Sequence, residues 1–360
     1  MTRITFVMEQ HIGHQTYYQN LRQGVELDGH IQAIWAPITY TGTNWLANLP
    51  GVPRRLRGTL HGMFQVRDAI ARADYDVAFF NTQVPAALAS RQVRRRPYVL
   101  ATDITPIQYD RMSHLYGHRA DRSGPLADYK QRVNIALLRG ASRILPWSNW
   151  TRESLIQDYG VGAERIDVVP PGVDLHLWTP AAKPNNGSLR ILFVGGDLYR
   201  KGGATLLKAF RALPRGAAEL HLVTRTPIAA EDGVHIYHAM QPNSPELIAL
   251  YQSADVFVLP TEAEAFGIAA IEASASGLAI VATAVGGLAD VVSEGETGFL
   301  VQPKDDVAVF AHLSRLAADP ELRARMGSAA RIRAEARFDA RRNAARVLEH
   351  LRAAANESSL

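Results

Sequence analysis

Short hydrophobic runs alternate along the chain with longer segments whose apolar residues recur at helical spacing. Apolar runs of about four to eight residues between helical segments predict parallel strands joined by crossover helices. In the first part of the chain these runs are 4–8, 32–35, 77–80, 98–101 and 143–146. A second series follows at 189–194, 219–223, 234–237, 256–259, 279–282 and 298–301. The expected fold class is therefore α/β, with two doubly wound parallel sheets.

A stretch without periodicity separates the two series. It is Pro180-Ala-Ala-Lys-Pro-Asn-Asn-Gly-Ser188, which is rich in turn-forming residues and typical of a domain linker. At 360 residues the chain exceeds the roughly 100–200 residues of one domain. We expect an N-terminal domain over 1–178, a C-terminal domain over 179–338, and a C-terminal helix over 339–360 that returns to the N-terminal domain. Further helices are expected to begin near Asp305-Asp306 and at Pro320.

The composition is that of a globular protein, with 47% hydrophobic and 21% charged residues. The absence of cysteine excludes disulfides, thiolate zinc sites and cysteine nucleophiles, and it fits a cytoplasmic protein. The apolar run before Glu9 is too short for a signal peptide or a membrane span.

The net charge is +4, and arginines gather in the first third of the chain. No aromatic and basic motif or helix-turn-helix spacing accompanies them, so nucleic acid is not an expected partner. Residues 51–64 mix basic and apolar side chains, a pattern that favours peripheral contact with an anionic membrane at its inner face. The alternative is a solvated basic helix.

The strongest candidate site follows the expected strand at 256–259. Phe266-Gly267 opens a helix there, so the backbone N–H groups of Phe266, Gly267 and Ile268 form a site for an anion such as a diphosphate. Glu264 lies in the preceding loop and Glu272 on the helix. Carboxylates accept hydrogen bonds from sugar and ribose hydroxyls, so this set predicts a nucleotide-sugar pocket. The alternative is a solvated loop carboxylate and a surface helical residue.

The surrounding sequence, Leu259 to Ala282, closely resembles the retaining glycosyltransferases of family 4, which have the GT-B fold. Their E-x7-E signature falls on Glu264 and Glu272, and Gly286-Gly287, residues 294–301 and Pro303 also match the family pattern. The resemblance covers residues 143–337 strongly and the N-terminal half weakly. It implies two Rossmann-like domains facing a central cleft, and a hexosyltransferase that moves sugar from a nucleoside diphosphate sugar to an acceptor hydroxyl with retention. It implies no metal and no cofactor besides this nucleotide-sugar co-substrate, and a place in polysaccharide or glycolipid biosynthesis.

The same resemblance assigns a phosphate-binding loop after the expected strand at 189–194. Lys201 matches the family lysine, but Gly196 stands where the family often has an arginine, so Arg200 is the candidate for the second positive charge. Fixed cations stabilise the charge that develops on a leaving diphosphate. The alternative is that Arg200 and Lys201 are an ordinary solvated loop pair.

In the N-terminal half, residues 6–16 correspond to the family's glycine-rich loop, and Gly13 is the position carried over to the donor site. His11 and His14 are candidate contacts to donor or acceptor. Asp103 stands where the family often has a histidine, so it is expected to orient an acceptor hydroxyl or donor sugar, or to act as a base. The alternative is a cap of the following turn. An acceptor-side cluster is expected from Tyr109, Asp110, Arg111 and His118.

Two further points limit the functional assignment. Asp74-Tyr75-Asp76 has the D-x-D form of a manganese site, but it directly precedes the expected strand at 77–80, where polar residues begin a strand, and no metal site is predicted. The departures at Gly196 and Asp103 leave two alternatives to transfer, namely a GT-B-like nucleotide-sugar epimerase or hydrolase and a catalytically inactive nucleotide-sugar-binding protein.

Overall fold

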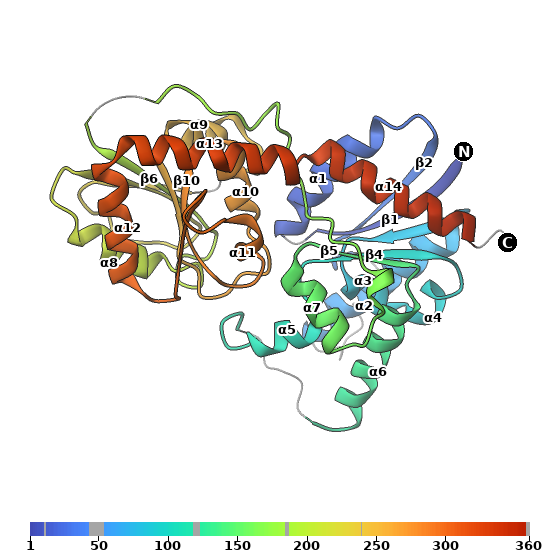
Figure 1. Ribbon diagram of the computed structural model, residues 1–360. Coiled ribbons are helices and arrows are strands. Elements are labelled where there is room, and N and C mark those ends of the chain that lie inside the picture. The colour runs from blue at the N-terminus through green and yellow to red at the C-terminus, as the bar shows by residue number, and fades with distance from the viewer. Residues whose placement is uncertain (11, 43–53, 118–122, 184–186, 239, 358–360) are drawn as a thin grey trace. The chain divides into compact units, whose positions relative to one another are not determined.

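The computed structural model describes residues 1–10, 12–42, 54–117, 123–183, 187–238 and 240–357 (Figure 1). The chain divides into two compact units. Unit 1 comprises residues 1–111, 119–171 and 340–360, and unit 2 comprises residues 112–118 and 172–339.

The chain passes from unit 1 to unit 2 before the stretch at 180–188 where the linker was expected. The cause is the packing of residues 172–178 within unit 2. The Val173 N–H donates to the Phe338 carbonyl at 2.8 Å, and Trp178 is buried with its ring edge against Tyr251. Residues 184–186 of the expected linker lie outside the described residues.

Unit 1 is built on a five-stranded parallel sheet with strand order β2-β1-β3-β4-β5. Its strands are β1 (Thr2–Glu9), β2 (Ile31–Ile38), β3 (Val77–Phe80), β4 (Tyr98–Thr102) and β5 (Arg143–Pro146). The connecting helices are α1 (Ile12–Glu26), α2 (Arg54–Arg72), α3 (Gln83–Leu88), α4 (Ser90–Val93), α5 (Pro106–Arg111), α6 (Pro125–Gly140) and α7 (Asn149–Gln157). The inner strands are almost wholly apolar because helices cover both faces of the sheet.

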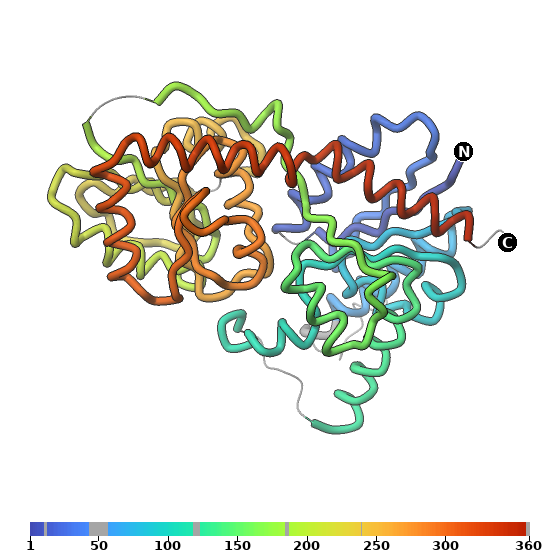
Figure 2. The backbone as a smooth tube through the Cα atoms, in the orientation of Figure 1, coloured from blue at the N-terminus to red at the C-terminus, as the bar shows by residue number. Residues whose placement is uncertain are grey.

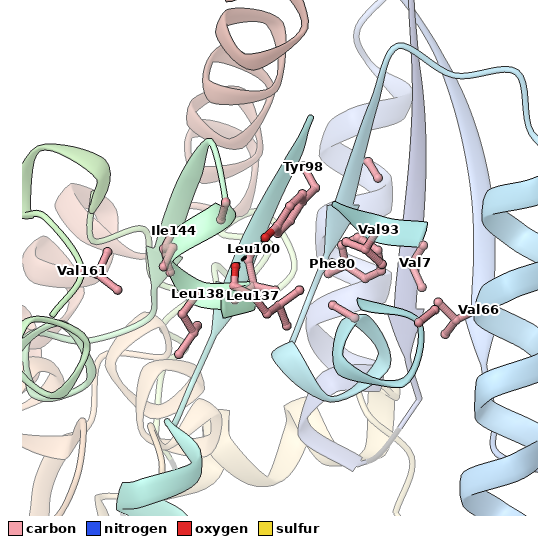
Figure 3. Close-up of a cluster of buried hydrophobic side chains, with 14 of the residues drawn as sticks. Val7, Val66, Phe80, Val93, Tyr98, Leu100, Leu137, Leu138, Ile144 and Val161 are labelled. Carbon is pink, nitrogen blue, oxygen red and sulfur yellow. Dashed lines mark hydrogen bonds between the residues drawn. The ribbon is translucent and has the colours of Figure 1, made fainter. Parts of the chain in front are cut away.

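One face of this sheet forms the core shown in Figure 3. Phe80 and Tyr98 meet edge to face with ring centroids 6.3 Å apart, and the Tyr98 hydroxyl donates to the Leu137 carbonyl. Val66 of α2 and Leu138 of α6 complete the layer over the strands. The buried tyrosine therefore keeps a hydrogen bond while its ring fills the core.

The last helix, α14 (Ala340–Glu357), belongs to unit 1. It runs beside α1, red next to blue in Figure 2, and buries Ala344, Val347 and Leu351. Contact between the two helices is close because α1 has glycine at position 24, where a Cβ atom would lie 2.5 Å from the Ala344 Cβ. The C-terminal residues thus form part of the unit that the N-terminal residues begin.

Unit 2 is built on a six-stranded parallel sheet with order β11-β10-β9-β6-β7-β8. Its strands are β6 (Leu189–Val194), β7 (Ala218–Val223), β8 (Val234–Tyr237), β9 (Val256–Leu259), β10 (Ala279–Thr283) and β11 (Gly298–Val301). Its helices are α8 (Gly203–Ala212), α9 (Pro245–Ser253), α10 (Ile268–Ala275), α11 (Leu288–Val291), α12 (Asp306–Ala318) and α13 (Pro320–Arg337). The predicted α/β class with two doubly wound parallel sheets is confirmed.

Each sheet has one point where neighbouring strands are followed by connections that lead in opposite directions. It lies between β1 and β3 in unit 1 and between β6 and β9 in unit 2. Loops diverge at the carboxyl ends of the strands there, and ligands of open α/β sheets bind in that crevice. Ligand-binding residues are therefore expected at the strand ends of these two switch points.

Candidate functional site

Two loops meet at the switch point of unit 2, namely residues 195–202 after β6 and residues 260–267 after β9. Gly202 has φ +77°, and a Cβ atom there would overlap the Pro260 carbonyl. The Glu262 N–H donates to the Arg200 carbonyl at 2.9 Å, and the Thr261 hydroxyl donates to the same oxygen at 3.2 Å. The two loops are consequently fixed against each other through their backbones.

Lys201 and Glu264 form an ion pair between these loops. The lysine side chain is 17% exposed and that of the glutamate 11%, so neither is a solvated surface charge. The carbonyl of Glu264 lies directly over Gly286, whose φ of +58° would be strained for any other residue. The loop after β10, which contains Gly286, thus joins the loops after β6 and β9 in positioning the Glu264 carboxylate and the Lys201 ammonium group.

The N-terminus of α10 adjoins this ion pair. Gly267 precedes the helix with φ +99°, and a Cβ atom there would lie 2.6 Å from a Leu288 methyl group. The Phe266 side chain is buried and packs against Phe338, so its ring belongs to the core beneath the helix N-terminus. The first N–H groups of a helix, here those beginning at Ile268, have no acceptor within the helix and favour an anion.

Glu272 lies on the buried side of α10. Its Oε2 accepts a hydrogen bond from the Tyr251 hydroxyl at 2.9 Å. Burial raises the pKa of Glu272 to about 7, and the hydrogen bond from Tyr251 opposes this rise. The alternative that Glu272 is a surface residue is therefore wrong, and its role toward a ribose stays a prediction.

The guanidinium group of Arg200 is already engaged within unit 2. It donates to the Ala263 carbonyl at 3.0 Å, lies 3.6 Å from an Asp197 oxygen, and stacks over the Tyr116 ring at 4.7 Å. Arg200 is thus no ordinary solvated residue, but its charge is shared with Asp197.

The space over Gly196 is occupied from another strand. A Cβ atom at Gly196 would lie 3.0 Å from both Nε and Nη2 of Arg225, which directly follows β7 and Thr224. Sequence analysis missed Arg225 because it lies outside the matching motifs. Its position after a buried strand next to β6 was the signal that could have identified it.

At the switch point of unit 1, Glu9 ends β1 and Asn81 follows β3. The Glu9 N–H donates to Asn81 Oδ1 at 2.7 Å, and Asn81 Nδ2 donates back to the Glu9 carbonyl at 3.1 Å. This reciprocal pair fixes the end of β1 and aims the Glu9 side chain into a buried position. Sequence analysis did not select Glu9 as a site residue, because its burial depends on a strand 72 positions away.

Glu9 and Asp103 are two carboxyl groups at this edge whose charges repel each other. Burial, followed by the charge of Asp103, raises the pKa of Glu9 to about 7, while the Tyr40 hydroxyl opposes the rise. Asp103 Oδ1 also lies 3.6 Å from His14 Nε2, and the His14 ring packs against Trp147. Near neutral pH this group of side chains can hold or release one proton at Glu9.

The helix that follows Asp103 is capped by other residues. Thr105 and Gln108 cap α5 instead, because the Gln108 N–H donates to the Thr105 hydroxyl at 3.2 Å and the Thr105 N–H donates to Gln108 Oε1 at 3.1 Å. The Asp103 carbonyl accepts from the Thr151 hydroxyl. Its carboxylate lies 3.6 Å from His14 Nε2, and its charge acts on Glu9.

The remaining described candidates of the N-terminal half lie on two helices. Gly13 lies exposed in the first turn of α1. Tyr109, Asp110 and Arg111 all lie on α5, and Arg111 forms an ion pair with Asp158 at 2.8 Å. His11 and His118 lie outside the described residues.

Two groups of possible metal ligands are engaged in other contacts. Asp74 and Asp76 both pair with Arg3, which lowers the pKa of Asp76. In the described part of the chain, Glu219, His221 and His235 bring ligand atoms within 4.8 Å of one another on β7 and β8. Arg190 Nε lies 3.7 Å from the Glu219 carboxylate, so a metal cation would compete there with a guanidinium group.

The expected membrane-facing stretch at 51–64 is described only in part, since residues 51–53 lie outside the described residues. In the rest, His61 is buried, while Met63 and Phe64 are half-buried. Across the described chain, every helix is too short or too polar to span a bilayer.

We predict that Gly202→Ala disrupts the paired loops more than Gly216→Ala does. Both glycines have φ +77°, so each substitution incurs the same left-handed strain of about 1–2 kcal/mol. A Cβ atom at Gly216 meets no atom within 4 Å, whereas one at Gly202 meets the Pro260 carbonyl. Thermal unfolding should therefore show a clearly larger loss for Gly202→Ala, and equal losses would contradict the tight packing of the loops.

We predict that Glu272→Gln flattens the dependence of stability on pH. The unfolded carboxyl group ionises near pH 4.5 and the folded one near pH 7. Its contribution to stability is therefore full below pH 4.5 and is lost as the pH rises through 7, by up to about 3 kcal/mol. Glutamine accepts the same hydrogen bond but does not ionise. Denaturant unfolding at pH 4.5 and pH 8 should show a smaller decline for the variant, and parallel declines would refute the raised pKa.

Two family models match adjacent parts of the chain. The model described as Glycosyltransferase Family 4 matches residues 16–177, and the model described as Glycosyl transferases group 1 matches residues 178–333. A D-inositol 3-phosphate glycosyltransferase of Arthrobacter sp. (strain FB24) is 34% identical over 262 residues, which cover 66% of this chain and 62% of the relative. A glycogen synthase of Mycobacterium tuberculosis (strain H37Rv) is 31% identical over 233 residues, covering 60% of this chain and 55% of that protein. The match thus spans between half and two thirds of the length of these relatives.

Solved structures share the fold at low sequence identity. Sucrose-phosphate synthase from Thermosynechococcus elongatus superposes with a TM-score of 0.79 at 21% identity, over 98% of both chains. Anabaena HepE in complex with UDP-glucose gives a TM-score of 0.72 at 19% identity, over 98% of this chain and 100% of that one. With both halves matched by family models and the whole fold shared with these structures, the chain belongs to the family 4 glycosyltransferases and has the GT-B fold.

Proposed function

We propose that this protein transfers a sugar from a nucleoside diphosphate sugar to an acceptor hydroxyl, with retention at the anomeric carbon and without a metal ion. The observation that carries the proposal is the Lys201 and Glu264 ion pair beside the N-terminus of α10. An ammonium group, a carboxylate and helix N–H groups at one switch point match the parts of a sugar diphosphate. Anabaena HepE, which shares the fold, is known in complex with UDP-glucose, and this supports a donor of the same class.

In this proposal, donor binding exchanges the partners of the ion pair. The diphosphate takes the Lys201 ammonium and the N–H groups at Gly267 and Ile268, which then stabilise the charge of the leaving group. Glu264 is released from Lys201 to accept hydrogen bonds from the sugar hydroxyls, and Glu272 accepts from the ribose. Metal-independent transfer follows because protein cations neutralise the diphosphate.

The acceptor side is proposed to use the two carboxyl groups at the switch point of unit 1. Asp103 orients the acceptor hydroxyl, and Glu9, with a pKa of about 7, exchanges a proton with it near neutral pH. The matched relatives are a D-inositol 3-phosphate glycosyltransferase and a glycogen synthase, so hydroxyl-bearing acceptors of both kinds belong in a first panel.

Contact of the basic helix α2 with an anionic membrane is a separate proposal, which cosedimentation with anionic vesicles would test.

The decisive experiment compares donor turnover with and without acceptor. UDP-, GDP- and ADP-sugars are first screened by thermal shift, because a ligand of the folded state raises the melting temperature. Sugar transfer with retained anomeric configuration supports the proposal. Conversion of the donor without acceptor would favour the epimerase or hydrolase, and binding without turnover the inactive protein. Loss of transfer in excess EDTA would contradict metal independence.

We predict that Lys201→Met and Glu264→Gln each lower kcat/KM for transfer by about 100- to 1,000-fold, as expected for a lost transition-state contact. Lys208→Met is the matched control, because Lys208 is an exposed lysine of α8 paired with Asp306. The control should keep wild-type kcat/KM. Near-normal transfer by either site variant would overturn the assignment of the donor site.

A further inference from the structure

Two cationic side chains flank Gly195 and Gly196, the first two residues of the loop that follows β6. A Cβ atom at Gly195 would lie 3.0 Å from the Cβ and Cγ atoms of Lys201, and one at Gly196 would lie 3.0 Å from the guanidinium group of Arg225. This loop begins directly after Val194, at the switch point of unit 2. Both side chains therefore converge on the same edge of the sheet, although they come from different loops.

Among the cations near this loop, Arg225 differs from Lys201 and Arg200 because, within the described residues, no carboxylate pairs with it. Lys201 pairs with Glu264, and Arg200 lies 3.6 Å from Asp197. Within the described ranges, no carboxylate lies within ion-pair distance of Arg225, and its side chain is exposed. An anion that reaches this edge thus meets one guanidinium group without having to displace a carboxylate.

The backbone around Arg225 is held in place by hydrogen bonds to the loop after β6. The Arg225 N–H donates to the Gly196 carbonyl at 3.2 Å, and the Leu198 N–H donates to the Thr226 hydroxyl at 3.1 Å. On the other side, the Thr224 N–H donates to the Tyr237 carbonyl at 3.1 Å. Because the base of the side chain is fixed, less conformational entropy is lost when the guanidinium group binds a ligand.

We propose that Arg225 binds the diphosphate of the donor, and that it takes over from β7 the role of the arginine that this chain lacks at position 196. A guanidinium fork binds phosphate oxygens in a bidentate manner, which a lysine does not. Glycine at position 196 leaves room for the guanidinium group of Arg225, because a side chain there would press against it. This inference rests on the proposed function and deepens its donor site.

Calorimetric titration of the full chain tests the inference. UDP, GDP and ADP are titrated into the wild type, and the nucleotide that binds is used for the variants. Arg225→Ala should weaken its binding by about 10- to 100-fold, the usual effect of a lost hydrogen bond to a charged group. Arg215→Ala is the matched control, because Arg215 is also exposed but precedes β7 at the opposite edge of the sheet. It should bind as the wild type does.

A charge relocation completes the test. In the double variant Gly196→Arg with Arg225→Ala, the space over residue 196 is free for the new side chain, and nucleotide binding should recover at least about tenfold relative to Arg225→Ala. Unchanged binding by Arg225→Ala would overturn the inference alone, as would a loss that the relocation does not restore. If the wild type binds none of the three diphosphates, the proposed function itself fails. Should Arg225→Ala melt early, Arg225→Gln provides the same comparison.

Discussion

The donor edge of unit 2 depends on the ion pair between Lys201 and Glu264. Both side chains are mostly withdrawn from water, so each would be costly to bury without the other. Their meeting requires close contact of the loops after β6, β9 and β10, which Gly202 and Gly286 permit at positive φ. A diphosphate sugar offers new partners to both residues, because its phosphate groups can pair with the ammonium group and its hydroxyls can donate hydrogen bonds to the carboxylate. Lys201 and Glu264 thus neutralise each other, and a ligand that carries both phosphate and hydroxyl groups can take both of them.

Both units place their ionisable groups at a switch point for the same physical reason. Their inner strands are covered by helices on both faces and admit almost only apolar side chains, so polar side chains are confined to the strand ends. Burial raises the pKa of Glu9, at the end of β1, and of Glu272, on α10 after β9, to about 7. Each raised pKa lowers stability at neutral pH relative to acid, because the unfolded carboxyl group ionises more readily. The fold therefore retains two carboxyl groups that packing alone would not favour.

The sequence predicted the strands and the starts of several helices because these depend on local pattern. Apolar runs marked every strand, and Asp305 and Asp319 cap α12 and α13 next to the positions where helices were expected. The sequence left a cap of the following turn as the alternative role of Asp103, and in the structure Thr105 and Gln108 cap α5. The sequence did not reveal the burial of Glu9, the hydrogen bond from Arg200 to the Ala263 carbonyl, or the position of Arg225 beside Gly196. Each depends on contacts between segments that are far apart in the sequence.

Arg225 shows why a motif is an incomplete description of a charged site. A motif records the position of a residue along the chain, whereas a phosphate group responds only to where the charge lies in space. Neighbouring parallel strands end about 4.8 Å apart, and an arginine side chain is longer than this distance. An arginine at the end of β7 therefore reaches the place served by a residue after β6, provided that the β6 residue has no side chain of its own. Gly196 meets that condition, so its departure from the family pattern and the position of Arg225 have one structural explanation.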